Sequence, residues 1–219
     1  SERSRGLGDV YKRQYVGGLS EFGVFSFDFG KMITTGEGGA LFAKRKSDGK
    51  NARMYHDHGP KNIPDLPRGL DRAGVVGFNY RMTEISGAFG KVQLEKFPRI
   101  LRDSKKRYRT LEKYIKHNQI KFRNVNKGNE PNYDTFVISI ENKKLRNRVI
   151  SLLHETGFGT KNLPDAFNWH CAYFWEHFDK NIRNKEVTSC YERLLNCVAI
   201  PILVSRPIID YKNIASYIN

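Results

Sequence analysis

A four-residue turn that contains three glycines, Gly36-Glu37-Gly38-Gly39, restricts the fold of this chain more than any other sequence feature. An apolar run at residues 23–27 comes before the turn, and a second at residues 40–43 follows it. Because glycine adopts backbone angles that other residues avoid, such a turn lets the chain reverse sharply. The pattern predicts a short buried strand at 23–27, a break at Phe29-Gly30-Lys31, and a returning strand at 40–43.

The rest of the chain combines helical and strand patterns. Residues 44–81 are polar and rich in proline and glycine, which is typical of loops. Thr83 is placed to cap a helix that runs to Phe97, and Pro98 suits the first turn of a second helix. The following pattern predicts a small α/β domain with an irregular, aromatic-rich segment at 160–177, strands at 135–140 and 197–203, and helices at 145–155, 186–196 and 210–219.

Composition places the 219-residue chain among globular proteins, with 39% hydrophobic and 28% charged residues. The formal net charge of +15 favours anionic partners such as nucleic acid, phosphorylated cofactors or acidic sugars, although drift in base composition also produces lysine. Three cysteines without a C-x-x-C pair argue against a disulfide framework, and no run approaches the roughly 20 apolar residues of a membrane span. We therefore expect a cytoplasmic protein.

The first 14 residues show neither helical nor alternating periodicity, and the chain begins with Ser1. We interpret residues 1–14 as a non-native tail from cloning or sequencing, the alternative being a native flexible arm. Residues 15–100 and 101–219 then form two predicted domains, joined by the long helical segment near 98–118.

The chemistry-bearing residues are concentrated between Ser26 and Gly39. Lys31 follows a predicted buried strand and lies between aromatic residues and glycine turns. Partial burial favours the neutral amine, which is the form that attacks a carbonyl carbon. The hydroxyl of Ser26 is close enough in sequence to reach the same pocket and donate to a phosphate. By spacing alone, a solvated lysine beside a glycine turn is the commoner situation.

Two motifs resemble signatures of one enzyme family. Phe25-Ser26-Phe27, Lys31 and Thr34-Thr35-Gly36-Glu37-Gly38-Gly39 resemble the pyridoxal-phosphate lysine motif of the DegT/StrS sugar aminotransferases. The segment 77–84, Gly-Phe-Asn-Tyr-Arg-Met-Thr-Glu, is similar to the second signature of that group. Both occur in the right order and separation, and the resemblance runs from about Tyr15 to the C-terminus.

The resemblance implies an α/β fold, namely the C-terminal part of a fold type I aminotransferase, with a remnant of the large-domain sheet and a small domain. It also implies a homodimer that transfers an amino group from glutamate to a sugar carbonyl. Lys31 would attach covalently to the cofactor pyridoxal phosphate, Ser26 would bind its phosphate, and Asn79 would reach the cofactor phosphate of the neighbouring subunit.

Three further stretches resemble transaminases that make 8-amino-3,8-dideoxy-manno-octulosonate, an amino form of a lipopolysaccharide sugar acid. On this resemblance Arg68, Arg81 and Lys161 suit the carboxylate of the sugar acid, and His170 lies on a segment expected to be either an active-site wall or an aromatic satellite of the core. A nucleotide-linked keto sugar is the alternative substrate. The stretches are His56-Asp57-His58-Gly59 with Pro67-Arg68-Gly69, residues 160–166, and Trp169-His170-Cys171-Ala172.

The chain departs from the family pattern upstream of Lys31. The aspartate that pairs with the pyridine nitrogen, the stacking aromatic residue and the phosphate-holding turn precede the lysine in this group, and this chain has only 30 residues there. We therefore expect a C-terminal fragment that does not turn over alone and that exposes an edge of its sheet.

Other function classes explain fewer residues. His56 and His58 supply at most two ligands on a polar loop, so we expect no metal site. The basic run from Lys105 to Arg109 would suit a nucleic-acid-binding module, but that function does not account for the motifs around Lys31 and Asn79. A folded, non-catalytic fragment is the third class.

Overall fold

The computed structural model describes residues 10–11, 14–72, 74–177 and 185–219. The chain divides into two compact units: Ser1–Arg99 with Asn126–Asn132, and Ile100–Val125 with Tyr133–Asn219. The tail predicted at 1–14 lies mostly outside the described residues. Its described part pairs β1 (Val10–Tyr11) with β2 (Gln14–Tyr15) in an antiparallel arrangement.

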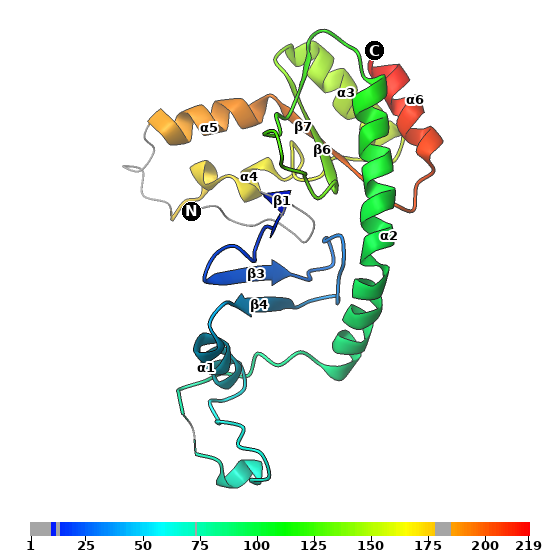
Figure 1. Ribbon diagram of the computed structural model, residues 1–219. Helices are drawn as coiled ribbons and strands as arrows, with labels where there is room; N and C mark the ends of the chain where they lie inside the picture. The colour runs from blue at the N-terminus through cyan, green and yellow to red at the C-terminus, as the bar shows by residue number, and fades with distance from the viewer. Residues whose placement is uncertain (1–9, 12–13, 73, 178–184) are drawn as a thin grey trace. The chain divides into compact units, whose positions relative to one another are not determined.

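The first unit contains the predicted reversal of the chain at the glycine turn. β3 (Phe22–Ser26) and β4 (Gly39–Ala43) form an antiparallel pair in which Phe22 lies opposite Ala43 and Ser26 opposite Gly39 (Figure 1). Both strands were predicted from the sequence, and both are confirmed.

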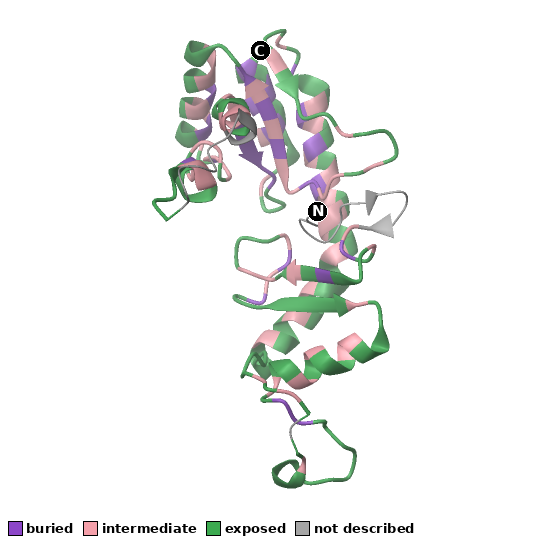
Figure 2. Cartoon of the chain, turned by 90° about the vertical axis from the view of Figure 1, so that its left-hand side faces the viewer, coloured by how far each residue is buried: buried purple, intermediate pink, exposed green. Residues whose placement is uncertain are grey.

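The burial predicted for the first of these strands is wrong. Val24 is 69% exposed and its cross-strand neighbour Leu41 is 50% exposed, and Figure 2 shows β4 almost entirely in the exposed colour. Phe42, which points to the opposite face of the pair, is also exposed. An apolar run predicts burial only where another layer packs on it, and within the described residues this pair is a separate two-stranded sheet.

The segment 44–81, predicted as loop, contains the helix α1 (Lys46–His56) and the short 3-10 helix η1 (Arg68–Leu70). None of the residues of α1 is buried. A helix that buries no face needs no stripe of apolar residues at helical spacing, which is the signal that predicts a helix from sequence. Its ends suit the helix dipole, because Asp48 lies in the first turn and His56 in the last.

A single helix of 31 residues, α2 (Glu84–Tyr114), replaces the two helices predicted to meet at Pro98. Thr83 caps it as predicted, since the Thr83 hydroxyl accepts a hydrogen bond from the Ser86 amide at 3.2 Å. A proline inside a helix removes one backbone donor and costs about 3 kcal/mol. The helix continues past Pro98 because its second half is packed, with Tyr108 and Leu111 buried.

The second unit is built on a three-stranded antiparallel sheet: β5 (Ile120–Phe122), β6 (Thr135–Ile140) and β7 (Cys197–Pro201), with β6 in the centre. The sequence predicted β6 with the same bounds and β7 to within two residues, whereas β5 was missed. The predicted helices are confirmed with small shifts as α3 (Lys143–Glu155), α5 (Lys185–Leu195) and α6 (Ile208–Ile218).

The core of this unit lies between the sheet, the second half of α2, α3 and α6. Its members are apolar side chains that are almost fully buried, including Leu111, Ile138, Leu153, Ile200 and Ile214. No helix in the described ranges is both long enough and apolar enough to cross a lipid bilayer.

The last residue of the chain fastens the end of α2. The side chain of Asn219 accepts a hydrogen bond from the Lys116 amide at 2.7 Å and donates one to the Tyr114 carbonyl at 2.8 Å. Arg107 adds a second long-range tie, because its guanidinium donates to the carbonyl of Arg206 at 2.9 Å.

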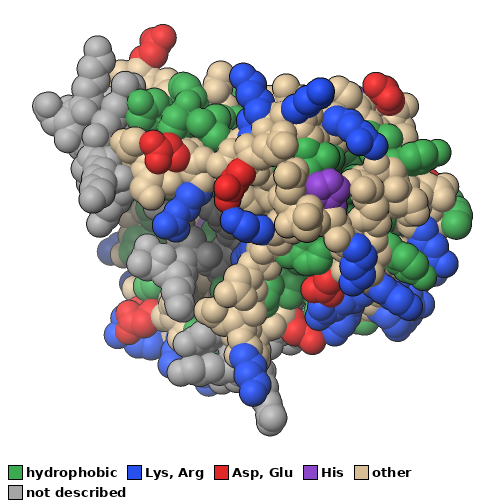
Figure 3. All heavy atoms as spheres, turned by 90° about the horizontal axis from the view of Figure 1, so that it is seen from above, with side chains coloured by type: hydrophobic (Ala, Val, Ile, Leu, Met, Phe, Trp, Pro, Cys, Tyr) green, Lys and Arg blue, Asp and Glu red, His purple; other side chains and the backbone are tan. Residues whose placement is uncertain are grey.

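The basic run on α2 is occupied by contacts within the unit. Lys105 lies over the ring of Tyr133, Lys106 lies 3.7 Å from Asp103, and Arg109 pairs with Glu112. Lysine and arginine side chains form several separate groups on the face shown in Figure 3, with acidic side chains among them. These contacts are typical of a helix surface bound to its own protein and give the nucleic-acid alternative no specific support.

Candidate active site

Lys31 lies in the loop that joins β3 to β4, and hydrogen bonds fold this loop onto itself. The amide of Phe27 donates to the carbonyl of Gly38 at 2.9 Å. The Phe27 carbonyl in turn accepts from the Thr35 amide and the Thr34 hydroxyl, both at 3.0 Å. The Lys31 amide donates to the Asp28 carbonyl at 3.0 Å, which fixes the backbone from which the lysine side chain extends.

Two glycines of the turn have no room for a side chain. A Cβ atom on Gly39 would lie 2.8 Å from the Phe25 carbonyl oxygen. On Gly38, which has a φ of +143°, a Cβ atom would lie 2.8 Å from the Thr35 hydroxyl and 2.9 Å from the end of Met82. The close approach of these groups explains why the turn is built from glycine.

The side chains of Lys31 and Ser26 are both exposed. Of the two situations considered for Lys31, the structure shows the solvated one, because the flanking Phe29 is itself 79% exposed and does not cover the amine. The Ser26 hydroxyl accepts a hydrogen bond from the Asp28 amide at 3.3 Å, and its own proton has no acceptor among the described residues. The hairpin thus carries an exposed hydroxyl donor at the end of β3 and an exposed amine in the loop that follows.

An apolar cavity of about 340 Å³ borders this loop. Phe27, Ile33 and Thr35 line it from the loop, Met82 lines it from the segment before α2, and Gly90 and Leu94 line it from the first half of α2. Gly90 allows the close contact, since a Cβ atom there would lie 2.7 Å from the methyl group of Thr35. The Lys31 motif and the motif that begins at Gly77 are 46 residues apart in the sequence, counted from Lys31 to Gly77. The shared cavity lining makes them neighbours in the first unit.

The second motif pairs with the segment that follows α1. Asp57 and Asn79 form an isolated antiparallel bridge. On either side of it, the Phe78 amide donates to the Tyr55 carbonyl and the Tyr80 amide to the His56 carbonyl, both at 2.8 Å. This pairing brings Asn79 next to Asp57, and both belong to the first unit.

Asp57 also gathers two of the predicted substrate-binding arginines. Its Oδ1 atom lies 2.5 Å from Arg68 Nη2 and 3.3 Å from Arg81 Nε. The hydrogen bond from Arg68 holds the pKa of Asp57 below its ordinary value, and the charges of Arg68, Arg81 and His56 act in the same direction against the effect of burial. The two arginines therefore already contact a carboxylate of this chain.

Lys161 and His170 belong to the second unit. The Lys161 amide donates to the Ala199 carbonyl at 2.8 Å, and its Nζ atom lies 3.0 Å from Asp134 Oδ2. The amine predicted to hold a substrate carboxylate is thus paired with Asp134. His170 is exposed and ends the short helix α4 (Phe167–His170).

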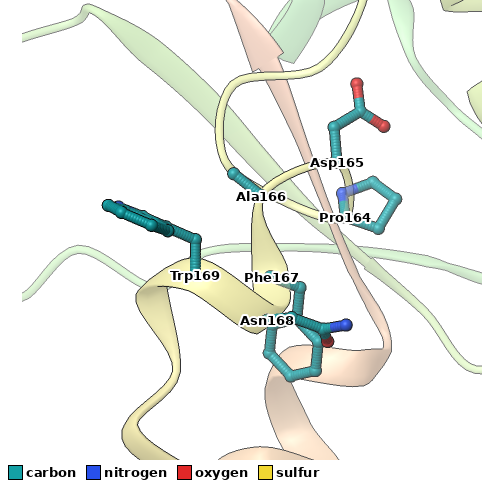
Figure 4. Close-up of a pocket in the computed structure, with 6 residues that line it drawn as sticks. All are labelled: Pro164, Asp165, Ala166, Phe167, Asn168 and Trp169. Carbon is teal, nitrogen blue, oxygen red and sulfur yellow. The ribbon is translucent and has the colours of Figure 1, made fainter. Parts of the chain in front are cut away.

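The segment around His170 contains an open cavity of about 520 Å³, lined by residues 164–169 (Figure 4). Trp169 is 78% exposed, and its ring points away from Pro164 and Asp165. Further along the chain, aromatic residues of the 3-10 helix η2 (Ala172–Phe174) pack on α5. The rings of Tyr173 and Tyr191 stack, with 4.6 Å between their centroids. The segment thus has an exposed part around Trp169 and a packed aromatic cluster around Tyr173. The sequence had left open whether it is an active-site wall or an aromatic satellite of the core, and each alternative describes one of these parts.

Metal-binding chemistry has no structural basis in the described part of the chain, where no group of three or more His, Cys, Asp or Glu residues is arranged to hold an ion. His56 Nδ1 lies 2.6 Å from the Arg53 carbonyl oxygen. The three cysteines are free, and burial raises the pKa of the Cys197 thiol.

Sequence reasoning missed the two carboxylates that organise the predicted cations. Asp57 was seen only as part of a histidine-rich stretch, and Asp134 was not noticed. For Asp57 the sequence offers one signal, the glycine two residues later. In the structure Gly59 has a φ of +96°, and a Cβ on it would lie 2.0 Å from the Val75 carbonyl oxygen, so only glycine allows this close approach of the two segments.

Comparison with known proteins gives a consistent result. A family model described as the DegT/DnrJ/EryC1/StrS aminotransferase family matches residues 3–206. The chain is 32% identical over 118 residues to the UDP-4-amino-4,6-dideoxy-N-acetyl-beta-L-altrosamine transaminase of Helicobacter pylori, covering 54% of this chain and 31% of that protein. It is 33% identical over 157 residues to the GDP-perosamine synthase of Escherichia coli O157:H7, covering 68% of this chain and 41% of that protein.

Among solved structures, Spr1654 from Streptococcus pneumoniae in its PMP form matches with a TM-score of 0.75 and 21% identity, covering 98% of this chain and 56% of that one. This likeness confirms the α/β fold class predicted from the sequence. The chain spans 31% and 41% of the two curated relatives and 56% of the solved structure.

Proposed function

Because the chain belongs to the DegT/DnrJ/EryC1/StrS aminotransferase family, we propose that it supplies the cofactor lysine and part of the substrate site of a pyridoxal-phosphate-dependent sugar aminotransferase. The reaction is transfer of an amino group from glutamate to a keto or aldehyde sugar. The carrying observation is the hairpin with exposed Ser26 at the end of β3 and exposed Lys31 in the loop that follows, a loop that borders the helix after the second motif. We assign residues 15–100 to the cofactor-binding domain and 101–219 to the small domain.

The residues of this loop fit the cofactor by their chemistry. Pyridoxal phosphate supplies an aldehyde that condenses with amines and a ring that withdraws electrons from the bound carbon. Lys31 offers an exposed primary amine, and Ser26 offers a hydroxyl proton that no described residue accepts. A phosphate group is a strong acceptor for such a proton.

The proposed roles follow from these groups. Lys31 would hold the cofactor through its amine, and when free of the cofactor that amine would accept and return a proton at the α carbon of the amino acid. Ser26 donates a hydrogen bond to the cofactor phosphate. Asn79, which is exposed, donates to the phosphate held by a second copy of the chain in a homodimer.

The sugar substrate is proposed to be anionic. The Arg68, Arg81 and Asp57 group carries a formal charge of +1, which attracts an anion without leaving two unpaired arginines. The resemblance of three stretches supports 8-oxo-3,8-dideoxy-manno-octulosonate, an acid used for lipopolysaccharide. The UDP and GDP in the names of the two relatives support a nucleotide-linked keto sugar as the second candidate.

Reductive trapping tests the function. The chain, and in parallel the longest product that its gene encodes, is incubated with pyridoxal phosphate, reduced with borohydride, digested and mapped by mass spectrometry. We expect the phosphopyridoxyl group on Lys31, its loss in Lys31→Arg, and its retention in the control Lys44→Arg, which changes another exposed lysine of the first unit. An adduct that maps to other lysines in both proteins while Lys31 stays unmodified refutes the proposal.

Supplying each candidate sugar with glutamate then identifies the acceptor. The product is detected by mass as the amino sugar, and the sugar that is aminated faster is the substrate. Amination of neither sugar by a protein that carries the Lys31 adduct would refute both candidate substrates and leave the cofactor assignment standing.

A further inference from the structure

The side-chain amide of Asn79 has a defined orientation. Its Oδ1 atom accepts a hydrogen bond from Arg81 Nε at 3.1 Å. No described residue accepts a hydrogen bond from its Nδ2 atom, and the residue is exposed. An amide has one acceptor end and one donor end, so with the oxygen occupied the Nδ2 protons of this exposed residue are available to another acceptor.

Asp57 holds the arginine that sets this orientation. Arg81 Nε lies 3.3 Å from Asp57 Oδ1, and the same oxygen receives Arg68 Nη2 at 2.5 Å. Only 13% of the Asp57 side chain is exposed, compared with 46% of Arg81. The Asp57 carboxylate is therefore the least exposed part of this group. The β-bridge between Asp57 and Asn79 also keeps the backbones of these two residues side by side.

We propose that Asp57 is a positioning residue: through Arg81 it keeps the Asn79 oxygen engaged, so that the Asn79 Nδ2 donors face outward toward a phosphate group. The phosphate part rests on the function proposed above for Asn79. If Arg81 were not held, the amide would be free to turn and offer its oxygen, which repels a phosphate.

Electrostatics alone gives the opposite expectation. Removal of a negative charge beside two arginines raises the affinity of the site for an anion. Positioning predicts a lower affinity after the same change, because the donors of Asn79 are no longer held outward. The sign of the change in phosphate affinity therefore separates the two explanations.

Nuclear magnetic resonance of the full chain follows the two side chains directly. Asp57→Asn keeps the shape and removes the charge that holds the Arg81 guanidinium in place. We expect Arg81 Nε then to lose its hydrogen bond to Asn79 Oδ1, and its hydrogen exchange to rise about tenfold, as expected for loss of about one hydrogen bond. We also expect the Asn79 Nδ2 signals to move toward those of a solvated asparagine. Arg81→Lys keeps the charge but removes the Nε donor, and it should move the Asn79 signals in the same way.

Three comparisons complete the test. The double variant should move the Asn79 signals no further than either single variant, since both changes break one chain of contacts. Asp57→Glu, which restores the charge on a longer arm, should recover part of the wild-type signals. Asp48→Asn removes an equal charge from the same unit, where Asp48 pairs with Arg45, and should leave both side chains unchanged.

Inorganic phosphate provides the binding readout. We expect it to shift the Asn79 Nδ2 signals of the wild-type chain and to bind more weakly to Asp57→Asn. Unchanged Arg81 and Asn79 signals in Asp57→Asn, or tighter phosphate binding by that variant, overturn the positioning role. Altered signals in the variants together with no response of wild-type Asn79 to phosphate support the positioning by Asp57 and refute the phosphate role of Asn79.

Discussion

Replacement of Gly39 by alanine is expected to loosen the hairpin that carries Ser26 and Lys31. The added Cβ would lie 2.8 Å from the Phe25 carbonyl oxygen, closer than a carbon and a carbonyl oxygen can approach. Gly39 lies directly opposite Ser26 in the strand pair, so the backbone has to move at the site itself. Because Gly39 does not have a positive φ, the effect comes from this contact alone.

The magnitude follows from the cost of overpacking. Forcing an extra methyl group into a filled space costs about 1–3 kcal/mol. If the cost falls on local opening of the hairpin, amide hydrogen exchange in β3 and β4 accelerates by about 5- to 150-fold. Exchange measured by mass spectrometry on peptides covering residues 22–43 reads this change, and peptides of the second unit serve as the internal reference.

Gly69→Ala is the matched control, because a Cβ atom at Gly69 meets nothing within 4 Å and that glycine also has no positive φ. We expect its exchange across 22–43 to equal that of the wild type. Equal protection of the hairpin in Gly39→Ala and Gly69→Ala would show that the turn tolerates a side chain and that our explanation of its glycines is incorrect.

Two further predictions concern stability. Leu153→Ala should lower the free energy of unfolding of the second unit by about 2–5 kcal/mol, because the Leu153 side chain is fully buried. Urea denaturation measures this change, and it should show a much smaller effect for the control Leu195→Ala, which truncates a side chain that is 40% exposed. The lowered pKa of Asp57 means that its pairing with Arg68 and Arg81 adds stability. This stability is complete above the ordinary carboxyl pKa of 3.8 and is lost as the pH falls through the lower folded value. Carboxyl carbon resonances followed against pH should show Asp57 titrating below 3.8, and a midpoint above that value contradicts the ion-pair geometry.

Sequence patterns predicted the second unit well because its elements bury one face each. Alternate residues of β6 are buried, which is the period-two pattern that the sequence shows at 135–140. The helix α1 could not be predicted in the same way, since none of its residues is buried. Pro98 was interpreted as the start of a helix because proline favours the first turn of a helix over its interior. In the structure the packing of Tyr108 and Leu111 keeps the helix continuous through Pro98.

The candidate site was predictable only in part. The motifs around Lys31 and Asn79 indicate the family from local sequence, and the family model that matches residues 3–206 confirms it. Local sequence could not decide between a partly buried and a solvated Lys31, because burial depends on layers that a local sequence does not contain, although the solvated state was the commoner expectation. The ion-pair partners of Arg68 and Lys161 could not be predicted either, since Asp57 and Asp134 are distant from them in the sequence and contact them only in the folded chain.

The ties made by Asn219 have a consequence for how the protein is made. A ribosome finishes α2 long before it adds Asn219, the residue whose side chain bonds to the Tyr114 carbonyl and the Lys116 amide. The strand β7 and the helix α6, which fill much of the same core, also follow α2 in the chain. Since non-local contacts form only after both partners exist, the core around the second half of α2 is expected to stay incomplete until residues 197–219 have been synthesised. Until then the apolar side chains of that half of α2 lack their native partners, which is the situation in which aggregation competes with folding.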